Sequence, residues 1–519
     1  MADYDIIIVG SGAGGGTLAY SLAGSGKRIL IIERGGFLPR EPENWIPAEV
    51  FGGARYKNTE LWLDRWDAGH LPGMHYFVGG NTKMFGAALP RLRREDFGEL
   101  RLLDGVSPAW PITYDEMAPY YSQAEILYKV HGKAGEDPTD PRGSEPYPYP
   151  AIEHAPEIEE LAEKLRRKGL HPFHLPLGLD FHQAGLCKLT KHCDGFPCQV
   201  GAKSDAEVCA VRPALDDKNV ELICTAKVER IIATSDGKRV ACVEAQVNGK
   251  TERFKAEVFV LSCGAVNSAA LLLRSAIGNS SGLAGCYYMA HLNGTVMSIR
   301  LTAKRRETVF QKTLALNDFY FAGRKNRNPL GNLQLIGKVQ SDMMRSGLPG
   351  WAWPRPNWAL EFASGRSLDW WVLSEDLPLK ENCVELTRNG QIKLNVRWTN
   401  RKSHRELVKR LCALMDFECC VHRIWDAERI GSCSHQVGTL RFGEDPKTSV
   451  LNEWCRSHDL ENLFVVDGSF FPSSAAVNPA LTIIAQALRV GNHIRERFGV
   501  GPKQALKRPT FETSNPTLI

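Results

Sequence analysis

The sequence lacks the long apolar run and the basic clusters that would tie it to a membrane or to nucleic acid. No stretch reaches the roughly 20 apolar residues that a membrane-spanning helix needs, and the start of the chain does not read as a cleavable secretory signal. The net charge is only +5 over 519 residues, and Lys and Arg do not gather into the clusters typical of nucleic-acid binders. We therefore expect a soluble cytoplasmic protein without a membrane span and without a nucleic-acid partner.

Disorder and a zinc-ribbon pattern are also disfavoured. Apolar residues make up 43% of the chain and charged residues 24%, close to globular averages, and the length suggests about three domain-sized units. The fourteen cysteines are expected to be mostly buried thiols in a reducing cytoplasm. Cys187, Cys193 and Cys198 are separated by five and four residues, which is not the C-x₂-C spacing of a zinc site.

What the sequence does contain is a dinucleotide-binding pattern at its N-terminus. Residues 4–9 and 28–32 are short β-branched apolar runs, typical of buried parallel strands. Between them Gly10, Gly12 and Gly15 form Gly-x-Gly-x-x-Gly. Gly10 allows a tight turn, Gly12 lets the backbone approach a pyrophosphate, and Gly15 lets helix and strand pack closely.

Glu33 completes this pattern at the end of the second strand. A helix expected over residues 17–23 would offer its unpaired N–H groups and positive dipole end to the phosphates. Glu33 lies 23 residues after Gly10, where its carboxylate can accept hydrogen bonds from ribose hydroxyls. The same carboxylate would repel a 2′-phosphate, which argues against NADP. The choice between FAD and NAD stays open on this element alone.

Several later segments carry recognisable patterns. Residues 78–88 combine paired glycines with small residues, which suits either a loop against a flat ligand or an ordinary glycine-rich loop. Residues 107–132 and 156–168 are expected to be mainly helical. The alternation over residues 220–247 predicts a hairpin, and residues 257–275 read as a second unit of strand, glycine turn and helix.

Residues 290–400 carry many short alternating runs, which predict an antiparallel sheet. Six of the twelve tryptophans fall in this stretch. Their aromatic faces suit the C–H faces of a sugar, although a lid or core role explains them equally well. These tryptophans are Trp351, Trp353, Trp358, Trp370, Trp371 and Trp398.

The C-terminal part contains another strand and a long helix. An apolar strand over residues 463–466 runs into Asp467-Gly468, and Asn478-Pro479 opens an apolar helix that reaches Val490. Asn478 before Pro479 is typical of a helix N-cap with Pro at the first helical position. The positive end of this helix could equally face a flavin ring that gains negative charge.

In this order and spacing the motifs resemble the glucose–methanol–choline (GMC) oxidoreductases over nearly the whole chain. The resemblance rests on the N-terminal pattern with Glu33 and on the blocks at residues 78–89, 264–275, 435–443 and 467–482. It implies an α/β fold in which an FAD-binding Rossmann-like domain of the glutathione-reductase type is interleaved with an α+β substrate domain built on an antiparallel sheet.

The resemblance also implies where the domains lie. The FAD-binding domain would be discontinuous, whereas the end of the chain would form a tail. The FAD-binding domain would comprise residues 1–95, 190–290 and 430–500, the substrate domain residues 96–189 and 291–429, and the C-terminal tail residues 501–519.

Site residues follow from the same resemblance. The ADP half of FAD would lie on Gly10, Gly12, Gly15 and Glu33, with Val228 beside the adenine. The remaining cofactor positions would be Gly80, Asn81, Thr82, Met84, Asp467, Gly468, Asn478, Pro479 and Thr482. His435 and Asn478 match the two catalytic positions, which makes the chain a His/Asn member of the family.

Within the family, residues 79–83, 311–313, 317–320 and 193–198 look most like bacterial pyranose oxidases and glycoside 3-oxidases. Fungal pyranose oxidases attach FAD to a His in the loop after the paired glycines. Here the loop reads Thr82-Lys83-Met84, so we predict non-covalent FAD. Some dehydrogenases of the family carry an iron–sulfur cluster near the cysteine trio, but we favour buried thiols and no metal.

The implied reaction is oxidation of a secondary hydroxyl of a sugar or glycoside to a 3-keto or 2-keto product. His435 would take the hydroxyl proton, because a neutral imidazole with a pKa near roughly 6.5 suits a base, and Asn478 would hydrogen-bond the same oxygen. His291 is a weaker candidate that we interpret as a core histidine. Hydride would pass to flavin N5, and O₂ or an artificial or quinone acceptor would reoxidise the flavin.

Two other functions stay open. One is a sugar or polyol dehydrogenase of the same fold that uses a quinone or haem partner. The other is a non-catalytic flavoprotein, which the pair His435 and Asn478 disfavours. The exact substrate, the oxidised carbon and the oligomeric state are not predicted.

Overall fold

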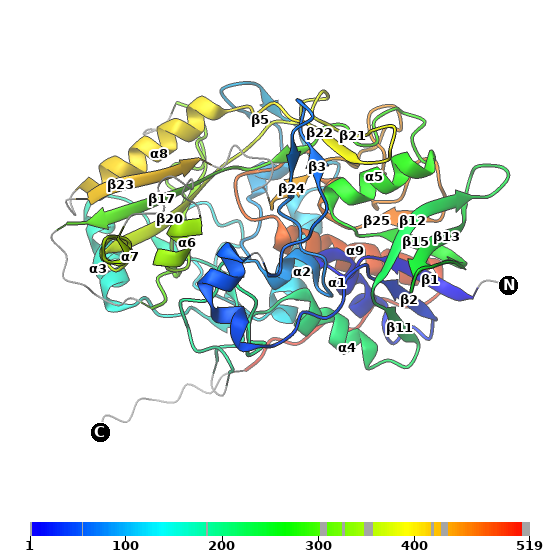
Figure 1. Ribbon diagram of the computed structural model, residues 1–519, viewed down its shortest axis with the longest axis horizontal. Coiled ribbons are helices and arrows are strands. Elements are labelled where there is room, and N and C mark those ends of the chain that lie inside the picture. The colour runs from blue at the N-terminus through cyan, green and yellow to red at the C-terminus, as the bar shows by residue number, and fades with distance from the viewer. Residues whose placement is uncertain are drawn as a thin grey trace.

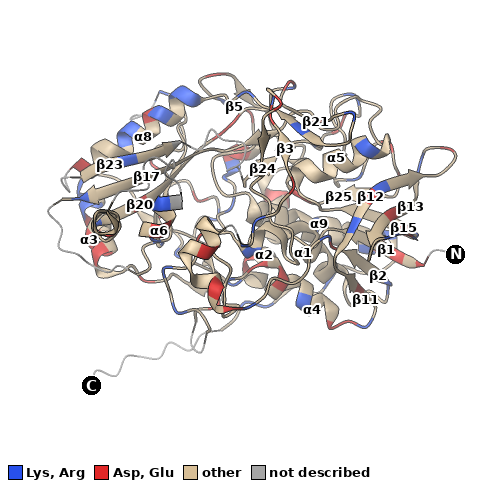
Figure 2. Ribbon diagram, viewed as in Figure 1, with Lys and Arg blue, Asp and Glu red and all other residues tan. Residues whose placement is uncertain are grey.

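The computed structural model describes residues 3–53, 55–182, 185–301, 309–323, 327–346, 356–416, 420–426 and 434–510. Figure 1 shows two lobes side by side, one built on a parallel sheet and the other on a larger antiparallel sheet. Basic and acidic residues are interspersed over both lobes (Figure 2).

A five-stranded parallel sheet forms the centre of the first lobe. Its order is β11 (Val220–Ile223), β2 (Ile29–Ile32), β1 (Tyr4–Val9), β15 (Ala256–Leu261) and β25 (Leu463–Val465). Successive residues of β1 and β2 point to opposite faces, yet both sets are buried. The sheet is thus covered on both sides, which explains its continuous apolar runs and confirms the strands predicted at the N-terminus.

The predicted hairpin is only partly correct. β11 pairs in parallel with β2, and Thr225 then takes a left-handed backbone conformation with φ of +53°, which ends the strand. The hairpin itself consists of β12 (Ala226–Ala233) and β13 (Val240–Val247), and β14 (Lys250–Phe254) extends it to three antiparallel strands.

Helices α1 (Ala13–Leu22), α5 (Ala265–Ser275) and α9 (Ala480–Arg497) belong to this lobe. The prediction that the first helix starts at residue 17 is wrong, because the preceding glycines are already helical. Close packing outweighs their low helix propensity: a Cβ on Gly14 would lie 1.9 Å from the carbonyl oxygen of Val466. The helix expected over residues 107–132 is limited to α2 (Tyr114–Leu127).

A six-stranded sheet forms the second lobe, and it confirms the predicted antiparallel character. Its order is β23 (Cys420–Asp426), β17 (Leu292–Arg300), β20 (Ser367–Ser374), β19 (Asn332–Leu335), β18 (Leu314–Leu316) and β9 (Phe173–His174). One face packs its apolar side chains against α3 (Pro156–Arg167) and α8 (Arg401–Met415). The opposite face is more polar.

Shorter elements complete the described part of the chain. A four-stranded sheet of β21 (Cys383–Leu386), β22 (Ile392–Asn395), β3 (Trp62–Leu63) and β4 (Gly69–His70) joins segments distant in sequence. The others are β5 (Leu100–Arg101), β6 (Val106–Ser107), β7 (Val130–Gly132), β8 (Tyr149–Pro150), β10 (Leu177–Gly178), β16 (Met289–Ala290), β24 (Gln436–Val437), α4 (Arg212–Leu215), α6 (Ser341–Ser346) and α7 (Asn357–Ser364).

The parallel sheet uses strands of the predicted FAD-binding segments and the six-stranded sheet uses strands of the predicted substrate segments, whereas the four-stranded sheet joins strands from both. The exact domain boundaries stay a prediction. None of the described helices is long and apolar enough to cross a membrane.

Candidate active site

The turn after β1 is shaped by its glycines. Gly10 has a φ of +97°, and a Cβ there would lie 2.2 Å from the carbonyl oxygen of Ser262. A Cβ on Gly15 would lie 2.0 Å from the carbonyl oxygen of Gly10. Both positions therefore require glycine, for the reasons that the sequence predicts.

The N-terminus of α1 directly follows this turn. The described structure shows no side-chain cap at Gly12 and no acidic residue in the first helical turn. The first N–H groups of a helix have no partner within it and carry partial positive charge. This helix end is consequently suited to hold an anionic group.

Glu33 lies at the same turn. Its buried carboxylate accepts hydrogen bonds from the N–H and hydroxyl of Ser11, at 2.9 and 2.7 Å, and from the N–H of Gly35 at 2.9 Å. Burial raises the pKa of Glu33, and these hydrogen bonds act in the opposite direction. The carboxylate thus stands beside the glycine turn, where its remaining lone pairs can accept from a ligand.

The loop with the paired glycines reaches the same place from another part of the chain. Gly79 and Gly80 have φ values of +96° and +57°, and a Cβ on Gly80 would lie 3.1 Å from the Cα of Gly12. The side chains of Thr82 and Asn81 tie this loop to other segments. The Thr82 hydroxyl accepts a hydrogen bond from the Ala206 N–H, and the Asn81 amide oxygen accepts one from the His75 N–H. Met84 packs in a separate apolar cluster.

Two other predicted cofactor positions also have structural partners. The Asp467 carboxylate accepts hydrogen bonds from the Gly264 N–H, at 3.0 Å, and from the hydroxyl of Ser268, so it joins the end of β25 to the second glycine turn. A Cβ on Gly468 would lie 2.7 Å from the carbonyl oxygen of Gln436. Close backbone contact accounts for that glycine.

Val228 is buried on β12, where the pairing with β13 shifts register. Thr482 is buried in the first turn of α9, and its hydroxyl lies 2.8 Å from the hydroxyl of Tyr121 on α2. Both positions have structural roles in the described chain, and their contact with a cofactor stays a prediction.

His435 and His291 meet through their side chains. The two Nδ1 atoms lie 3.0 Å apart, and the rings are nearly perpendicular. The Nε2 atom of His291 lies 2.9 Å from the carbonyl oxygen of Ser474. His291 is thus a core histidine, as predicted, but it is also the hydrogen-bond partner of the predicted base, which the sequence does not reveal.

Burial favours the neutral form of both imidazoles. Burial lowers the pKa of His291 to about 4, against the opposing effect of the Ser474 and Ala475 carbonyls. Burial also lowers the pKa of His435 well below its usual range, and the neighbouring His291 and the positive charge of Lys312 add to this. A neutral imidazole can accept a proton, which the role of a base requires.

Asn478 does not cap the helix that follows it. α9 begins at Ala480 with Pro479 in the N-cap position, and no side-chain cap is found there in the described structure. The Asn478 Oδ1 atom is buried without a hydrogen-bond partner among the described residues. Buried polar atoms are rarely left unpaired, so this amide is available for a ligand.

The polar face of the six-stranded sheet holds further unpaired groups. Direct cross-strand partners share a face, and here Trp371 of β20 lies opposite Thr295 and Gln334. Several buried atoms on or beside this face lack a hydrogen-bond partner within the described residues. They are Asn293 Nδ2 and Oδ1, Gln311 Oε1, Gln334 Oε1 and Trp371 Nε1.

Of the predicted tryptophans in the described residues, Trp371 lies on this polar face, where it also packs beside an apolar cluster, and Trp398 packs against the core of the first lobe. Trp370, next to Trp371, points to the opposite face and is fully buried in the apolar core. Trp358 is 70% exposed on α7. Trp351 and Trp353 lie outside the described residues.

Two sequence models of the GMC oxidoreductase family match residues 112–293 and 378–487, more than half of the chain together. The chain belongs to the GMC oxidoreductase family. This GMC oxidoreductase is 29% identical to paromamine 6′-oxidase of Streptomyces fradiae over 94% of this chain and 90% of that protein. It is 26% identical to 2-methyl-1,2-propanediol dehydrogenase of Mycolicibacterium austroafricanum over 95% of each chain.

Among solved structures, pyridoxine 4-oxidase from Mesorbium loti is similar with a TM-score of 0.68 at 18% identity, over 95% of this chain and 99% of that one. At this identity the likeness concerns the fold alone. The fold predicted from the motifs, an FAD-binding domain joined to a substrate domain, is confirmed.

GMC oxidoreductases bind FAD, and the residues present in this member fit that cofactor. The uncapped N-terminus of α1 suits a pyrophosphate. The close approach of Gly12 and Gly80 makes a side chain at Gly80 a tight fit, and Glu33 supplies a carboxylate at the turn. The chain thus offers a binding place where its two glycine loops meet.

The cysteine trio of this GMC oxidoreductase does not form a metal centre in the described structure. No group of three or more His, Cys, Asp or Glu side chains in the described ranges is arranged to hold a metal ion. The Cys198 sulfur accepts hydrogen bonds from the N–H groups of Ala202 and Lys203, at 3.2 and 3.4 Å. Burial raises the pKa of Cys193 to about 12, which keeps it a thiol.

Proposed function

We propose that this GMC oxidoreductase oxidises a secondary hydroxyl of a neutral sugar or glycoside to a keto sugar, with His435 as the base. The observation that carries the proposal is the neutral His435 ring held by His291, together with the unpaired amide oxygen of Asn478. Alcohol oxidation requires a proton acceptor from the protein, and the NH₂ of the Asn478 amide can donate a hydrogen bond that orients the substrate oxygen.

In the proposed reaction His435 accepts the hydroxyl proton of the substrate. Asn478 donates a hydrogen bond from its amide NH₂ to the same oxygen, because the hydroxyl proton goes to His435, and so fixes the direction of the neighbouring C–H bond. FAD, when bound, supplies the hydride acceptor. The low pKa of His435 keeps the base unprotonated at neutral pH, so no prior deprotonation step is needed.

The polar sheet face supports a sugar as the substrate. Amide groups of Asn293, Gln311 and Gln334 have unpaired buried atoms that can pair with hydroxyls, and Trp371 offers an indole whose face suits the C–H side of a ring. Paromamine 6′-oxidase acts, by its name, on an amino-sugar compound, which also favours the carbohydrate class.

A neutral sugar suits this face better than a polycationic aminoglycoside. Lys312 is buried and ion-paired with Asp194, and Lys338 lies 3.5 Å from the carboxylate of Asp369. These carboxylates are already used by lysines, so they are not available for ammonium groups of a substrate.

FAD is proposed to be bound non-covalently, because the loop of Thr82, Lys83 and Met84 contains no histidine. The proposed electron acceptor is O₂. A second candidate function is a dehydrogenase that passes electrons to a quinone or haem partner and reacts slowly with O₂. The similarity to 2-methyl-1,2-propanediol dehydrogenase favours this alternative.

An anaerobic screen of the purified holoenzyme tests the proposal. Monosaccharides, O- and C-glycosides, paromamine, simple alcohols and pyridoxine are mixed with the enzyme, and flavin bleaching is followed. We expect the fastest bleaching with a neutral sugar or glycoside, and NMR of the product should show a ring ketone. Faster bleaching by paromamine or by a simple alcohol contradicts the proposed substrate class. Peroxide formed in air separates the oxidase from the dehydrogenase.

A further inference from the structure

The hydrogen bonds around His291 can be assigned from atom types alone. A carbonyl oxygen only accepts hydrogen bonds, so the Nε2 atom of His291, 2.9 Å from the carbonyl oxygen of Ser474, must carry a hydrogen. A neutral imidazole carries one ring hydrogen. The Nδ1 atom of His291 is therefore a bare acceptor.

This assignment fixes the tautomer of the neighbouring ring. The Nδ1 atoms of His291 and His435 are 3.0 Å apart, and two bare nitrogens at that distance would repel each other. His435 must then donate from Nδ1, which leaves its Nε2 atom as the bare nitrogen that can take a proton. We propose that His291 is a positioning residue that holds His435 in the Nδ1–H tautomer and so presents Nε2 as the base.

The Ser474 carbonyl, which accepts the hydrogen bond of His291, is itself held in place by neighbouring residues. The Ser474 hydroxyl donates to the carbonyl oxygen of Asp376 at 3.0 Å and accepts from its N–H at 3.2 Å. The Asp376 carboxylate accepts from the N–H and hydroxyl of Thr399, at 3.1 and 2.7 Å. Ser474 thus anchors the segment that leads to Asn478 and also presents the carbonyl that orients His291.

The arrangement also determines where the proton goes. When His435 takes the hydroxyl proton at Nε2, its ring becomes positively charged and its Nδ1–H still points at a bare nitrogen. His291 cannot pass a proton onward, because its Nε2–H faces an amide carbonyl. The charge thus stays on the two rings until the proton is released to solvent.

The groups that face these rings are few among the described residues. The pKa of His435 is affected by burial, His291 and Lys312, and that of His291 by burial and the carbonyls of Ser474 and Ala475. No carboxylate is among them. In this site a neutral histidine takes the orienting place that a carboxylate fills in a Ser-His-Asp triad.

The first test needs no substrate, although the base role of His435 rests on the proposed function. Holoenzyme labelled with ¹⁵N-histidine is studied by long-range ¹H–¹⁵N NMR, and the His435 signals are assigned by their loss in His435→Gln. We expect His435 with Nδ1 protonated and Nε2 bare, and His291 with the reverse. An Nε2–H tautomer for His435 overturns the proposal.

Variants give the second test. His291→Leu removes the acceptor, so we expect a mixed or Nε2–H tautomer for His435 and flavin reduction slower by roughly 10- to 100-fold, as for lost outer-shell partners of a functional histidine. His291→Gln keeps an acceptor and a donor on one amide and should restore most of the rate. An unchanged His435 tautomer in His291→Leu overturns the proposal.

His131→Leu is the matched control, because His131 is also buried and lies within hydrogen-bond distance of two carbonyls, those of Pro150 and Leu179. It should cost stability without changing the His435 signals. If His291→Leu does not fold, the NMR tautomers of His435 and His291 in the wild type decide the proposal. If no sugar bleaches the flavin, the proposed function fails, while the NMR result still decides the role of His291.

Discussion

Gly12 and Gly80 face each other across the two glycine loops so closely that a Cβ on Gly80 would lie 3.1 Å from the Cα of Gly12. The two residues come from the end of β1 and from the loop before residue 84, far apart in sequence. Their contact brings the uncapped start of α1 next to the second loop. The proposed FAD site depends on this approach.

Gly80→Ala should therefore weaken FAD retention. The substitution adds a Cβ to this contact and strains a residue with φ of +57°, at a cost of about 1–2 kcal/mol. We expect a lower ratio of FAD to protein after gel filtration and a larger dissociation constant on titration with FAD.

Gly24→Ala is the control for backbone strain. Gly24 has φ of +77°, but within the described residues a Cβ there meets no atom within 4 Å. It should lose similar stability and keep its FAD. Equal FAD content in the two variants would contradict a role for the Gly12–Gly80 contact in binding.

The N-terminal site could be predicted because its requirements are local. Gly10 and Gly15 are needed for a turn and a close approach within one unit of strand, turn and helix, and Glu33 follows at a fixed spacing. The local sequence pattern also places the start of α1 too late, at residue 17. Gly14 is already helical, and it packs closely on Val466, which is far away in the sequence.

The partner of His435 could not be predicted for a similar reason. His291 lies 144 residues away, and β16 and β24 bring the two segments together. Likewise, the sequence left a capping role for Asn478 open beside the catalytic one, whereas the helix start at Ala480 leaves its amide oxygen without a partner among the described residues. A side chain's local pattern does not determine its partners when these come from distant strands.

His435→Ala should abolish rapid flavin reduction and leave FAD bound. Loss of a general base costs roughly 10²–10⁴-fold in rate, whereas the glycine loops and Glu33 are untouched. Stopped-flow bleaching with the best sugar measures the rate, and the flavin spectrum reports occupancy. A reduction rate equal to that of the wild type would sink the assignment of His435 as the base.

Asn478→Ala should slow reduction by a smaller factor than His435→Ala. The proposed role is one hydrogen bond to the substrate oxygen, worth about 1 kcal/mol and up to roughly 3 kcal/mol when the partner is charged, or about 5- to 150-fold in rate. Because the described residues do not use Asn478 Oδ1, the melting temperature should change little. A large loss of stability with normal reduction would point to a structural role.

The pH dependence of reduction should reflect the low pKa of His435. The base works in its neutral form, and burial, His291 and Lys312 hold its pKa well below the ordinary value of 6.5. The rate of flavin reduction should thus stay constant as the pH falls from 8 to about 6.5, and decline only at lower pH. Lys312→Met removes a positive charge, so the pKa of His435 should rise and the acid decline should begin at higher pH.

Lys338→Met serves as the control, because Lys338 is also ion-paired on a carboxylate and does not influence the pKa of His435. Its acid decline should coincide with that of the wild type. If the wild type, Lys312→Met and Lys338→Met have the same pH profile, Lys312 does not act on the pKa of His435.

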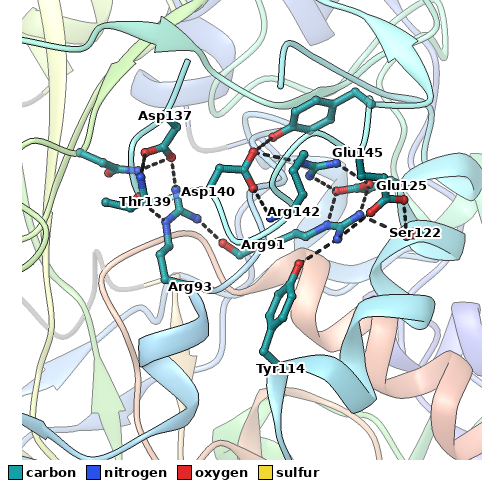
Figure 3. A network of polar contacts seen from close by, with 12 residues as sticks. Arg91, Arg93, Tyr114, Ser122, Glu125, Asp137, Thr139, Asp140, Arg142 and Glu145 are labelled. Atoms are coloured by element: carbon teal, nitrogen blue, oxygen red, sulfur yellow. Dashed lines mark hydrogen bonds and ion pairs between the residues drawn. The ribbon is translucent and has the colours of Figure 1, made fainter. Parts of the chain in front are cut away.

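A buried ion network beside α2 should contribute strongly to stability. Figure 3 shows Glu125 between Arg91 and Arg142, and both guanidinium groups bind its carboxylate, at 2.8 and 2.6 Å. Burial alone would raise the pKa of Glu125, but the two arginines outweigh it and lower the value to about 2. The ionised form is thus the one that the fold stabilises.

Glu125→Gln should destabilise the fold by about 3 kcal/mol, because it removes the carboxylate that two buried guanidinium groups share. Arg91 then keeps only Glu145, and Arg142 keeps only Asp140, as carboxylate partners among the described residues. In the wild type this contribution is complete above the unfolded pKa near 4.5 and is lost as the pH falls toward 2. Urea unfolding at pH 7 and pH 4 measures both effects. Asp115→Asn, which breaks an exposed pair with Arg94, should leave the urea midpoint unchanged. Equal midpoints for Glu125→Gln and the wild type would show that the arginines find other partners.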